Sequence, residues 1–404
     1  MKSQAGQSLI FLIAISGVVC LVAKPSISRA ETFGEQFLRY FPRADFDGDG
    51  VLSEKEEAAV SKRVIQRFPK VDTDGDGLLS KSEKTQLLKK VALMRGRADD
   101  GPAVGGFFGG KSSTNNPEPS FAEVAYGEDE RNVFDIWLAD SEAPTPLAVY
   151  IHGGGFKSGS KEKLQKETLT ELLDSGISVA AINYRLVTTD PLPTAHHDAR
   201  RAVQFMRSKA ADWNIDKNRV AAFGGSAGAQ ICMWLAFSDD MANAASNDPI
   251  ERESTRLLCV ATAGGQTSNE SEFYMERILP LLGGQAKDET LVTLLSGGRD
   301  FEKVKIAMWG GTTLEAANET AKQCSALRLI SSDDPPIFMR YGMAPDAEKP
   351  EDMSRLRGWL IHHVVFGTSL KERADELDVE ADLFYPGSNS KYSSEAAFFR
   401  DKLR

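Results

Sequence analysis

The chain has 404 residues, and its 48 Lys and Arg against 58 Asp and Glu give a formal net charge of −10 at pH 7. This length is comfortable for two domains, and 41% hydrophobic with 26% charged residues is the composition of a globular protein with a normal core. The acidic balance disfavours nucleic acid and anionic lipid as partners, so we expect neither.

Residues 1–30 have the layout of a secretory leader. Lys2 precedes a nearly unbroken apolar run from Leu9 to Ala23, and residues 28–30 form a small-x-small cleavage site. This run is shorter than the roughly 20 residues that a membrane-spanning helix needs. We therefore predict a signal peptide over 1–30, a secreted or periplasmic location, and no membrane association after the leader is removed. An uncleaved anchor is the alternative.

Residues 31–94 contain an acidic motif twice, 27 positions apart, with the pattern Asp-x-Asp-Gly-Asp-Gly-x-Leu-Ser-x-x-Glu. Each copy offers carboxylates at positions 1, 3 and 5, a main-chain carbonyl at 7, a hydroxyl at 9 and a bidentate glutamate at 12. Hard oxygen ligands at this spacing suit Ca²⁺. The predicted calcium ligands are Asp45, Asp47, Asp49, Val51, Ser53 and Glu56 in the first loop, and Asp72, Asp74, Asp76, Leu78, Ser80 and Glu83 in the second.

This repeat resembles an EF-hand pair, because a merely solvated acidic surface would not place the glycine and the final glutamate correctly twice. The resemblance implies a small all-α module that binds Ca²⁺. We expect the calcium to have a structural role, and a docking module for a protein partner is the alternative. Residues 95–119 are rich in Gly, Asp, Ser, Asn and Pro, which predicts a linker.

From residue 120 to 404, short apolar runs alternate with helical patterns, which predicts an α/β fold with a mostly parallel sheet and helices on both faces. The expected strands are 121–126, 132–138, 147–152, 177–184, 219–224, 257–263, 336–341 and 380–385. The expected helices are 161–174, 195–211, 227–238, 364–376 and 392–402.

Two glycine-rich segments in this region point to nucleophilic chemistry. Residues 224–228 read Gly-x-Ser-x-Gly between an apolar strand and a helix, which is the context of a serine held on a sharp turn. Residues 152–155 read His-Gly-Gly-Gly after another buried strand, and backbone N–H groups without side chains suit an oxyanion hole. A flexible turn is the alternative for the second motif.

Together these motifs resemble the α/β-hydrolase family, in its HGGG-type carboxylesterase branch. The resemblance implies Ser226 as the nucleophile and the N–H groups of Gly153, Gly154 and Ala227 as the oxyanion hole. It also implies a small-molecule or glycan-linked ester as substrate. We read residues 266–334 as a cap over the site, in which Phe273, Tyr274 and Trp309 line a pocket or form the core of the cap.

The remaining members of a catalytic triad are less regular. Asp346 follows the strand that delivers the acid in this fold, with Asp352 as the second choice. Relatives usually carry the histidine after a strand that ends in Pro-Gly, but residues 386–391 contain none. His362 and His363 remain as candidates for the base, and we favour His363. A solvated turn is the alternative for this pair.

Two functions are consistent with these features. The first is an exported serine esterase that works through an acyl-enzyme, with Ser226 as nucleophile, His363 as base and Asp346 as orienting acid. The second is a binding protein on a hydrolase scaffold that has lost its base and docks through its calcium module.

Overall fold

The structure is a computed structural model that describes residues 116–284 and 286–404, together with isolated positions between Ser53 and Glu83. The chain divides into two compact units, Met1–Gly96 and Arg97–Arg404. The predicted leader, the first acidic loop apart from Ser53, and residues 95–115 of the predicted linker lie outside the described residues. No helix within the described ranges is both long and apolar enough to cross a membrane.

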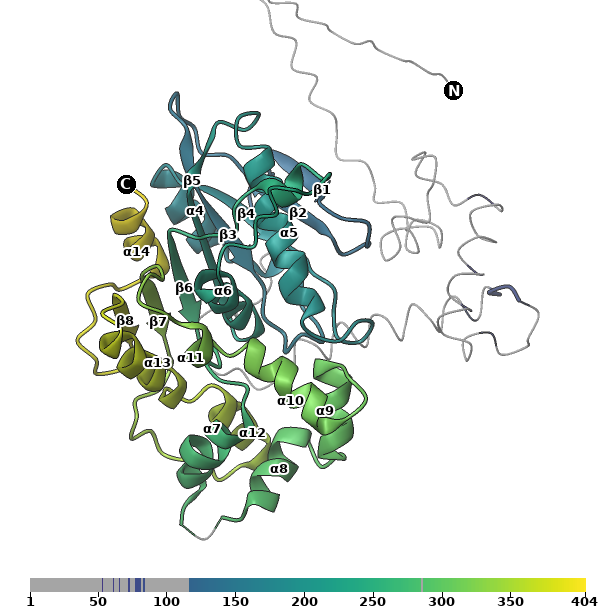
Figure 1. Cartoon of the computed structure of the whole chain (residues 1–404), viewed down its shortest axis with the longest axis vertical. Helices are drawn as coiled ribbons and strands as arrows, with labels where there is room; N and C mark the ends of the chain where they lie inside the picture. The colour runs from purple at the N-terminus through teal and green to yellow at the C-terminus, as the bar shows by residue number, and fades with distance from the viewer. Residues whose placement is uncertain are drawn as a thin grey trace, which may run out of the picture. The chain divides into compact units, whose positions relative to one another are not determined.

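The second unit is built on one eight-stranded sheet in the order β1-β2-β4-β3-β5-β6-β7-β8 (Figure 1). β2 runs antiparallel to both of its neighbours, and all other neighbouring pairs are parallel. Each of the eight predicted strands is confirmed to within a few residues. Their bounds are β1 Phe121–Ala125, β2 Val133–Trp137, β3 Thr145–Ile151, β4 Ser178–Ile182, β5 Ile215–Gly225, β6 Cys259–Ala263, β7 Ile337–Arg340 and β8 Ala381–Phe384.

Helices cover both faces of the sheet, as the alternating pattern predicted. One apolar cluster joins side chains of α4 and α14 to alternate residues of the strands, and the other joins α5, α6 and α13 to the opposite face. Strand residues fully buried on both faces explain the continuous apolar runs in the sequence. The bounds are α4 Lys166–Asp174, α5 Thr194–Ser208, α6 Ala227–Phe237, α13 Val365–Glu376 and α14 Glu395–Lys402.

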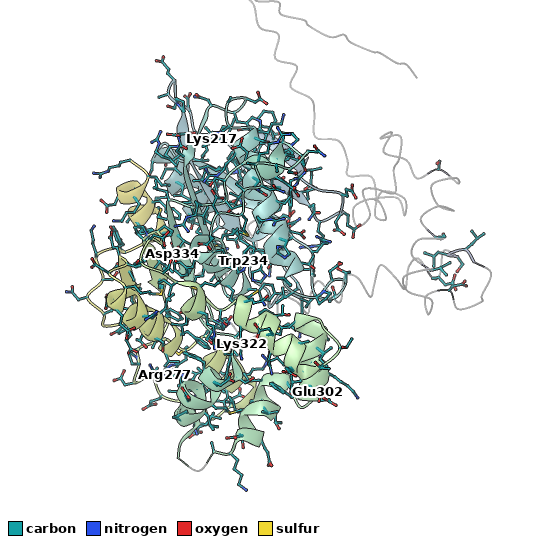
Figure 2. The ribbon with its side chains drawn as sticks, in the orientation of Figure 1. Lys217, Trp234, Arg277, Glu302, Lys322 and Asp334 are labelled. Atoms are coloured by element: carbon teal, nitrogen blue, oxygen red, sulfur yellow. The ribbon has the colours of Figure 1, made fainter. Side chains whose placement is uncertain are left out.

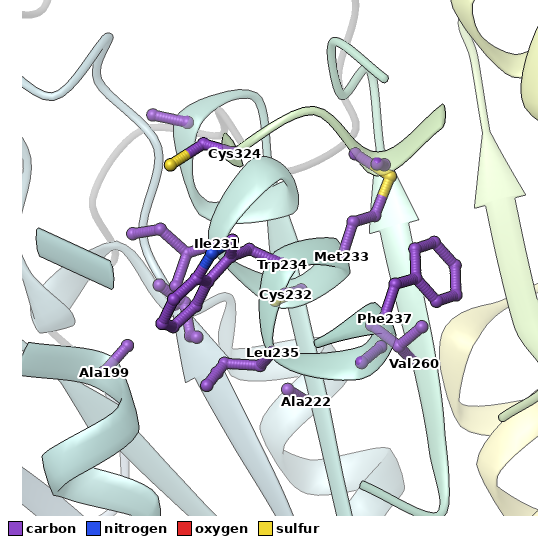
Figure 3. Packing of buried hydrophobic residues seen from close by; sticks show 14 of the residues in the cluster. Ala199, Ala222, Ile231, Cys232, Met233, Trp234, Leu235, Phe237, Val260 and Cys324 are labelled. Carbon is purple, nitrogen blue, oxygen red and sulfur yellow. The ribbon is translucent and has the colours of Figure 1, made fainter. Parts of the chain in front are cut away.

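Helix α6 is buried on every side (Figure 3). Its side chains pack against β5 at Ala222, β6 at Val260 and α5 at Ala199, and Cys324 of the insertion lies near its outer side. A helix surrounded in this way has no solvent-facing stripe, which accounts for its uniformly apolar sequence. The helix is therefore a rigid support for the residue that precedes it, Ser226.

The segment between β6 and β7 is helical and gathers with α12 at the end of the unit opposite Lys217 of β5 (Figures 1 and 2). We call residues 266–334 the cap. The sequence predicted this insertion without assigning helices to it, and it did not predict α12. The bounds are α7 Ser271–Phe273, α8 Asp288–Ser296, α9 Phe301–Trp309, α10 Leu314–Gln323, α11 Ala326–Leu329 and, beyond β7, α12 Met353–Ile361.

The turn from β5 into α6 lies directly against the end of β3. A Cβ atom on either Gly224 or Gly228 would overlap the carbonyl oxygen of Ile151. Neither collision could be relieved by turning a side chain, because the obstacle is main chain in a sheet. The two outer glycines of Gly-x-Ser-x-Gly are thus required by the close approach of three backbone segments.

We predict that Gly228→Ala lowers the free energy of unfolding by roughly 1–3 kcal/mol, because the new methyl group must displace the end of β3. Chemical denaturation monitored by tryptophan fluorescence measures this change. Gly284→Ala is the matched control, since nothing lies within 4 Å of a Cβ at that position. Equal stability of the two variants would contradict the packing argument.

Candidate active site

Ser226 lies between β5 and α6 in a strained backbone conformation, with φ 52° and ψ −116°. A positive φ is unfavourable for a residue with a side chain, and such strain is typical of functional turns. Its N–H donates to the carbonyl of Ala263 at the end of β6 (2.9 Å), which holds the turn against the sheet. The N–H groups of the first turn of α6 surround the serine and favour developing negative charge.

The glycine-rich loop after β3 approaches this serine closely. A Cβ on Gly153 would lie 2.7 Å from the carbonyl oxygen of Gly225 and 3.5 Å from Cβ of Ser226. Gly154 and Gly155 both have positive φ, at 123° and 59°, so the loop follows a path that glycine readily adopts. The structure therefore brings the predicted oxyanion residues Gly153 and Gly154 to the same place as Ser226 and Ala227.

His152 is a structural part of this loop. Its ring is fully buried, stacks on Tyr184 with centroids 4.1 Å apart, and lies 3.3 Å from a guanidinium nitrogen of Arg131. Tyr184 also donates its hydroxyl to the His152 carbonyl (2.7 Å). Burial lowers the pKa of His152 to about 3, so the ring is neutral at pH 7 and fixes the glycines that follow it.

His362 lines the same pocket as Ser226. It follows the last turn of α12, and its Nδ1 lies 2.8 Å from the carbonyl oxygen of Gly264, just after β6. This contact makes Nδ1 the protonated nitrogen and leaves a lone pair on Nε2. Within residues 116–404, Nε2 of His362 makes no hydrogen bond, so it is available to accept a proton.

Two glutamines hold the segment that carries His362. Gln266 donates its side-chain amide to the carbonyls of Ile361 and Gly264, the latter at 3.3 Å. Gln230 of α6 donates to the Gln266 side-chain oxygen at 2.6 Å. The end of α12 is thereby tied to α6, the helix that follows Ser226, and both glutamines line the pocket.

His363 has a different position. It is 2% exposed, packs edge-on against Trp359 and accepts the N–H of Val365 on Nδ1 (3.2 Å), which caps the start of α13. Its Nε2 is buried and has no hydrogen-bond partner among the described residues, and burial lowers the pKa of His363 to about 4. His363 does not line the pocket, so the geometry favours His362 over our sequence-based preference for His363.

The expected acid is not brought to the histidine. Asp346 is exposed in the loop after β7 and lines no part of the pocket, and Asp352 is exposed just before α12. The segment after β8, where the resemblance places the histidine, is held against β8, because the Ser390 hydroxyl donates to Asp382 of that strand. Within the described residues, the partner of His362 Nδ1 is therefore a main-chain carbonyl and not a carboxylate.

The pocket above Ser226 has a volume of about 690 Å³. Its walls come from the glycine-rich loop, α6, the cap and α12, and most of them are apolar. Of the three aromatic residues predicted for the cap, Tyr274 and Trp309 line the pocket, whereas Phe273 packs on Phe366 with centroids 5.2 Å apart. The cap thus supplies much of the surface that a substrate meets.

Burial is the main cause that lowers the pKa of His362 below its ordinary value, and the positive charge of Arg357 lowers it further. The hydrogen bond to Gly264 acts in the opposite direction. A neutral imidazole is the form that can accept a proton from a serine, so the pocket keeps this ring ready for base catalysis at neutral pH.

The described residues of the second acidic loop show a sharp, capped turn. Gly77 has φ 80° and donates its N–H to the Asp72 carboxylate (3.1 Å). Ser80 donates its N–H to Glu83 (2.9 Å), and Glu83 donates its N–H to the Ser80 hydroxyl (3.3 Å). This reciprocal pair is a capping box that begins a helix. Leu78 is exposed, and the other predicted ligands of this loop, Asp74 and Asp76, lie outside the described residues.

Sequence reasoning missed the residues that hold His362. Gly264 offers no side-chain chemistry, yet its carbonyl orients the His362 ring. A main-chain carbonyl has no sequence signature, and Gln230 and Gln266 resemble ordinary polar residues. The signal that was present is the absence of histidine after β8, which left His362 and His363 as the candidates.

Strand order, the strained serine and the glycine-rich loop define this unit as an α/β hydrolase of the serine-hydrolase class. A family model described as BD-FAE matches residues 134–360, more than half of the chain. The chain therefore belongs to the BD-FAE family.

Known relatives agree with this class. The chain is 27% identical over 132 residues to the esterase LipQ of Mycobacterium tuberculosis, which covers 32% of this chain and 30% of that protein. It is 37% identical over 201 residues to the probable carboxylesterase 6 of Arabidopsis thaliana. This match covers 47% of this chain and 52% of that protein. The chain thus spans about a third to a half of these relatives. A truncated carbohydrate esterase from gut microbiota has the same fold, with a TM-score of 0.51, 17% identity, and coverage of 70% of this chain and 95% of that one.

We predict that His362 titrates below pH 6.5 and that Arg357→Gln raises its pKa, because one nearby positive charge is removed. Titration of the histidine side chains by NMR in Ser226→Ala protein measures both values. Arg355→Gln is the control, since it removes an exposed charge from the same helix without touching the pocket. An unchanged pKa in Arg357→Gln would contradict this account.

Proposed function

We propose that this protein hydrolyses carboxylic esters through an acyl-enzyme on Ser226. One observation carries this proposal: His362 lines the pocket of Ser226 with Nδ1 bonded to Gly264, and its Nε2 has no hydrogen bond from the described residues. A serine hydroxyl needs a base to become a nucleophile, and an imidazole in this tautomer is such a base.

In the first step, Ser226 Oγ attacks the carbonyl carbon of the ester while Nε2 of His362 takes the hydroxyl proton. The N–H groups of Gly153, Gly154 and Ala227 stabilise the oxyanion. As the intermediate collapses, the bond to the alcohol breaks and the alcohol oxygen takes the proton from Nε2. Water then attacks the acyl-serine by the same route and releases the acid.

The carbonyl of Gly264 takes the place that a carboxylate has in a triad. It holds the ring orientation and the tautomer, and its partial negative charge stabilises the imidazolium that forms during the reaction. We therefore assign the base role to His362, the capping role to His363, and no catalytic role to Asp346.

We predict that a fluorophosphonate probe labels the wild type but not Ser226→Ala, and that His362→Ala lowers kcat/KM for p-nitrophenyl acetate by about 10³-fold or more. His363→Asn is the matched control, because the amide oxygen can still accept the N–H of Val365, and we expect near-wild-type activity. Loss of activity in His363→Asn with retention in His362→Ala would reverse the assignment. A folded wild type that takes no label would instead favour a binding protein on this scaffold.

We also propose that the N-terminal unit binds Ca²⁺ for structural stability and that the protein is exported with its leader removed. The turn at Gly77, the carboxylate of Asp72 beside it and the capping box at Ser80 and Glu83 fit the geometry that a calcium loop requires. Asp72, Asp74, Asp76, Leu78, Ser80 and Glu83 would hold one ion, and Asp45, Asp47, Asp49, Val51, Ser53 and Glu56 a second. Bound Ca²⁺ would neutralise the clustered carboxylates.

Calorimetric titration of the full chain with CaCl₂ after chelation tests this proposal. We expect two ions to bind to the wild type, and Glu56→Gln combined with Glu83→Gln to remove binding, because each loop loses its bidentate ligand. Glu54→Gln is the control, since it removes a charge from a loop position that supplies no ligand. Equal binding in all three proteins would overturn the calcium proposal without affecting the esterase.

A further inference from the structure

Four basic residues line the pocket above Ser226, and no acidic residue among the described residues does. Lys157 follows the glycine-rich loop, Arg299 precedes α9, Lys305 lies on α9, and Arg357 lies on α12. They come from separate segments of the chain, yet they converge on one cavity. A neutral ester carries no charge that could pair with the cations of this cavity.

None of these four cations forms an ion pair with a carboxylate within residues 116–404. Lys305 donates to the carbonyl of Asn269 (3.1 Å), and Arg299 donates to the carbonyl of Ser296 (3.1 Å). Elsewhere on the cap the same residue types are neutralised, as in Arg328 with Glu270 (2.7 Å) and Arg277 with Glu372 (3.1 Å). The four cations of the pocket therefore have no carboxylate partner within the described residues.

The cations also act on one another. Burial, with the charges of Arg299 and Arg357, lowers the pKa of Lys157. Burial lowers the pKa of Lys305 to about 8, although Glu272 and Glu270 oppose this effect. Of these glutamates, Glu270 is engaged by Arg328, and neither lines the pocket. A bound anion would relieve the repulsion and the desolvation together.

A second cavity of about 470 Å³ adjoins the first and shares Lys157 and Arg299 with it. Lys303 lines this second cavity, and its ammonium group forms an ion pair with the Asp300 carboxylate (3.6 Å). The shared cations thus line both cavities. An anionic group bound there would hold an ester in the cavity that Ser226 also lines.

We propose that this pocket selects esters that carry a carboxylate, either on the acyl part or on the alcohol part, and that Arg299, Lys305, Lys157 and Arg357 bind that carboxylate. This inference rests on the proposed esterase function and adds the class of substrate. Charge-assisted hydrogen bonds to a carboxylate in a partly buried site give discrimination against a neutral isostere.

Two pairs of isosteric esters test the inference. Monoethyl glutarate is compared with ethyl glutaramate for the acyl part, and the O-acetyl ester of methyl glucuronoside with that of its uronamide for the alcohol part. We expect kcat/KM to be at least about 10-fold higher for the carboxylate in one pair, and this pair identifies the side of the ester that carries the charge. Added NaCl should reduce the preference, because salt screens the attraction.

Lys305→Gln and Arg299→Gln should bring that ratio close to one while the amide is still hydrolysed. Lys303→Gln is the matched control on the same helix, and it should keep the preference, since Lys303 lies outside the pocket above Ser226. Equal rates for acid and amide in both pairs would overturn the inference and leave the esterase intact.

A measurement without turnover separates the two proposals. Calorimetry on the wild type compares glutarate with glutaramide, and glucuronate with its amide. Tighter binding of an acid supports the carboxylate site even if no ester is hydrolysed. Equal binding of acid and amide in both cases overturns it, whatever the fate of the proposed hydrolysis.

Discussion

The architecture of this site depends on one close contact, in which the carbonyl of Ile151 lies against Gly224 and Gly228. This contact brings the end of β3 onto the turn between β5 and α6. It places Gly153 beside Ser226 and holds the serine at a positive φ that its own side chain opposes. The packing of the sheet and of the fully buried α6 offsets the energy of that strain.

The sheet could be predicted well because its inner strands, such as β3, β4 and β6, are buried on both faces and therefore appear as uninterrupted apolar runs between turn signals. The motifs at 152–155 and 224–228 were equally clear in the sequence. Main-chain atoms lie too close to Gly153, Gly154, Gly224 and Gly228 for a larger residue. The cap was harder, because its helices are short, irregular and only partly buried. The helix α12 was missed for the same reason, and with it the direction from which His362 enters the pocket.

The base illustrates a deeper limit of sequence reasoning. Knowledge of the triad order directs attention to carboxylates after β7, and Asp346 satisfies that rule in sequence but is exposed in space. The actual neighbour of His362 is the carbonyl of Gly264, an atom that every residue possesses. The choice between His362 and His363 likewise depended on which ring faces inward at the end of a helix. Both residues lie past Ile361, in the turn that leads into α13, where no helical periodicity indicates the direction of a side chain, so the sequence could not decide between them.

The placement of the imidazole directly after α12 has a mechanical consequence. His362 follows the end of the short helix that carries Arg357, whereas Ser226 lies between β5 and the buried α6. A displacement of α12 would carry the imidazole and the guanidinium away from the serine together. The hydrogen bonds of Gln266 to the end of α12 would resist such a displacement, because Gln266 is itself held by Gln230 of α6.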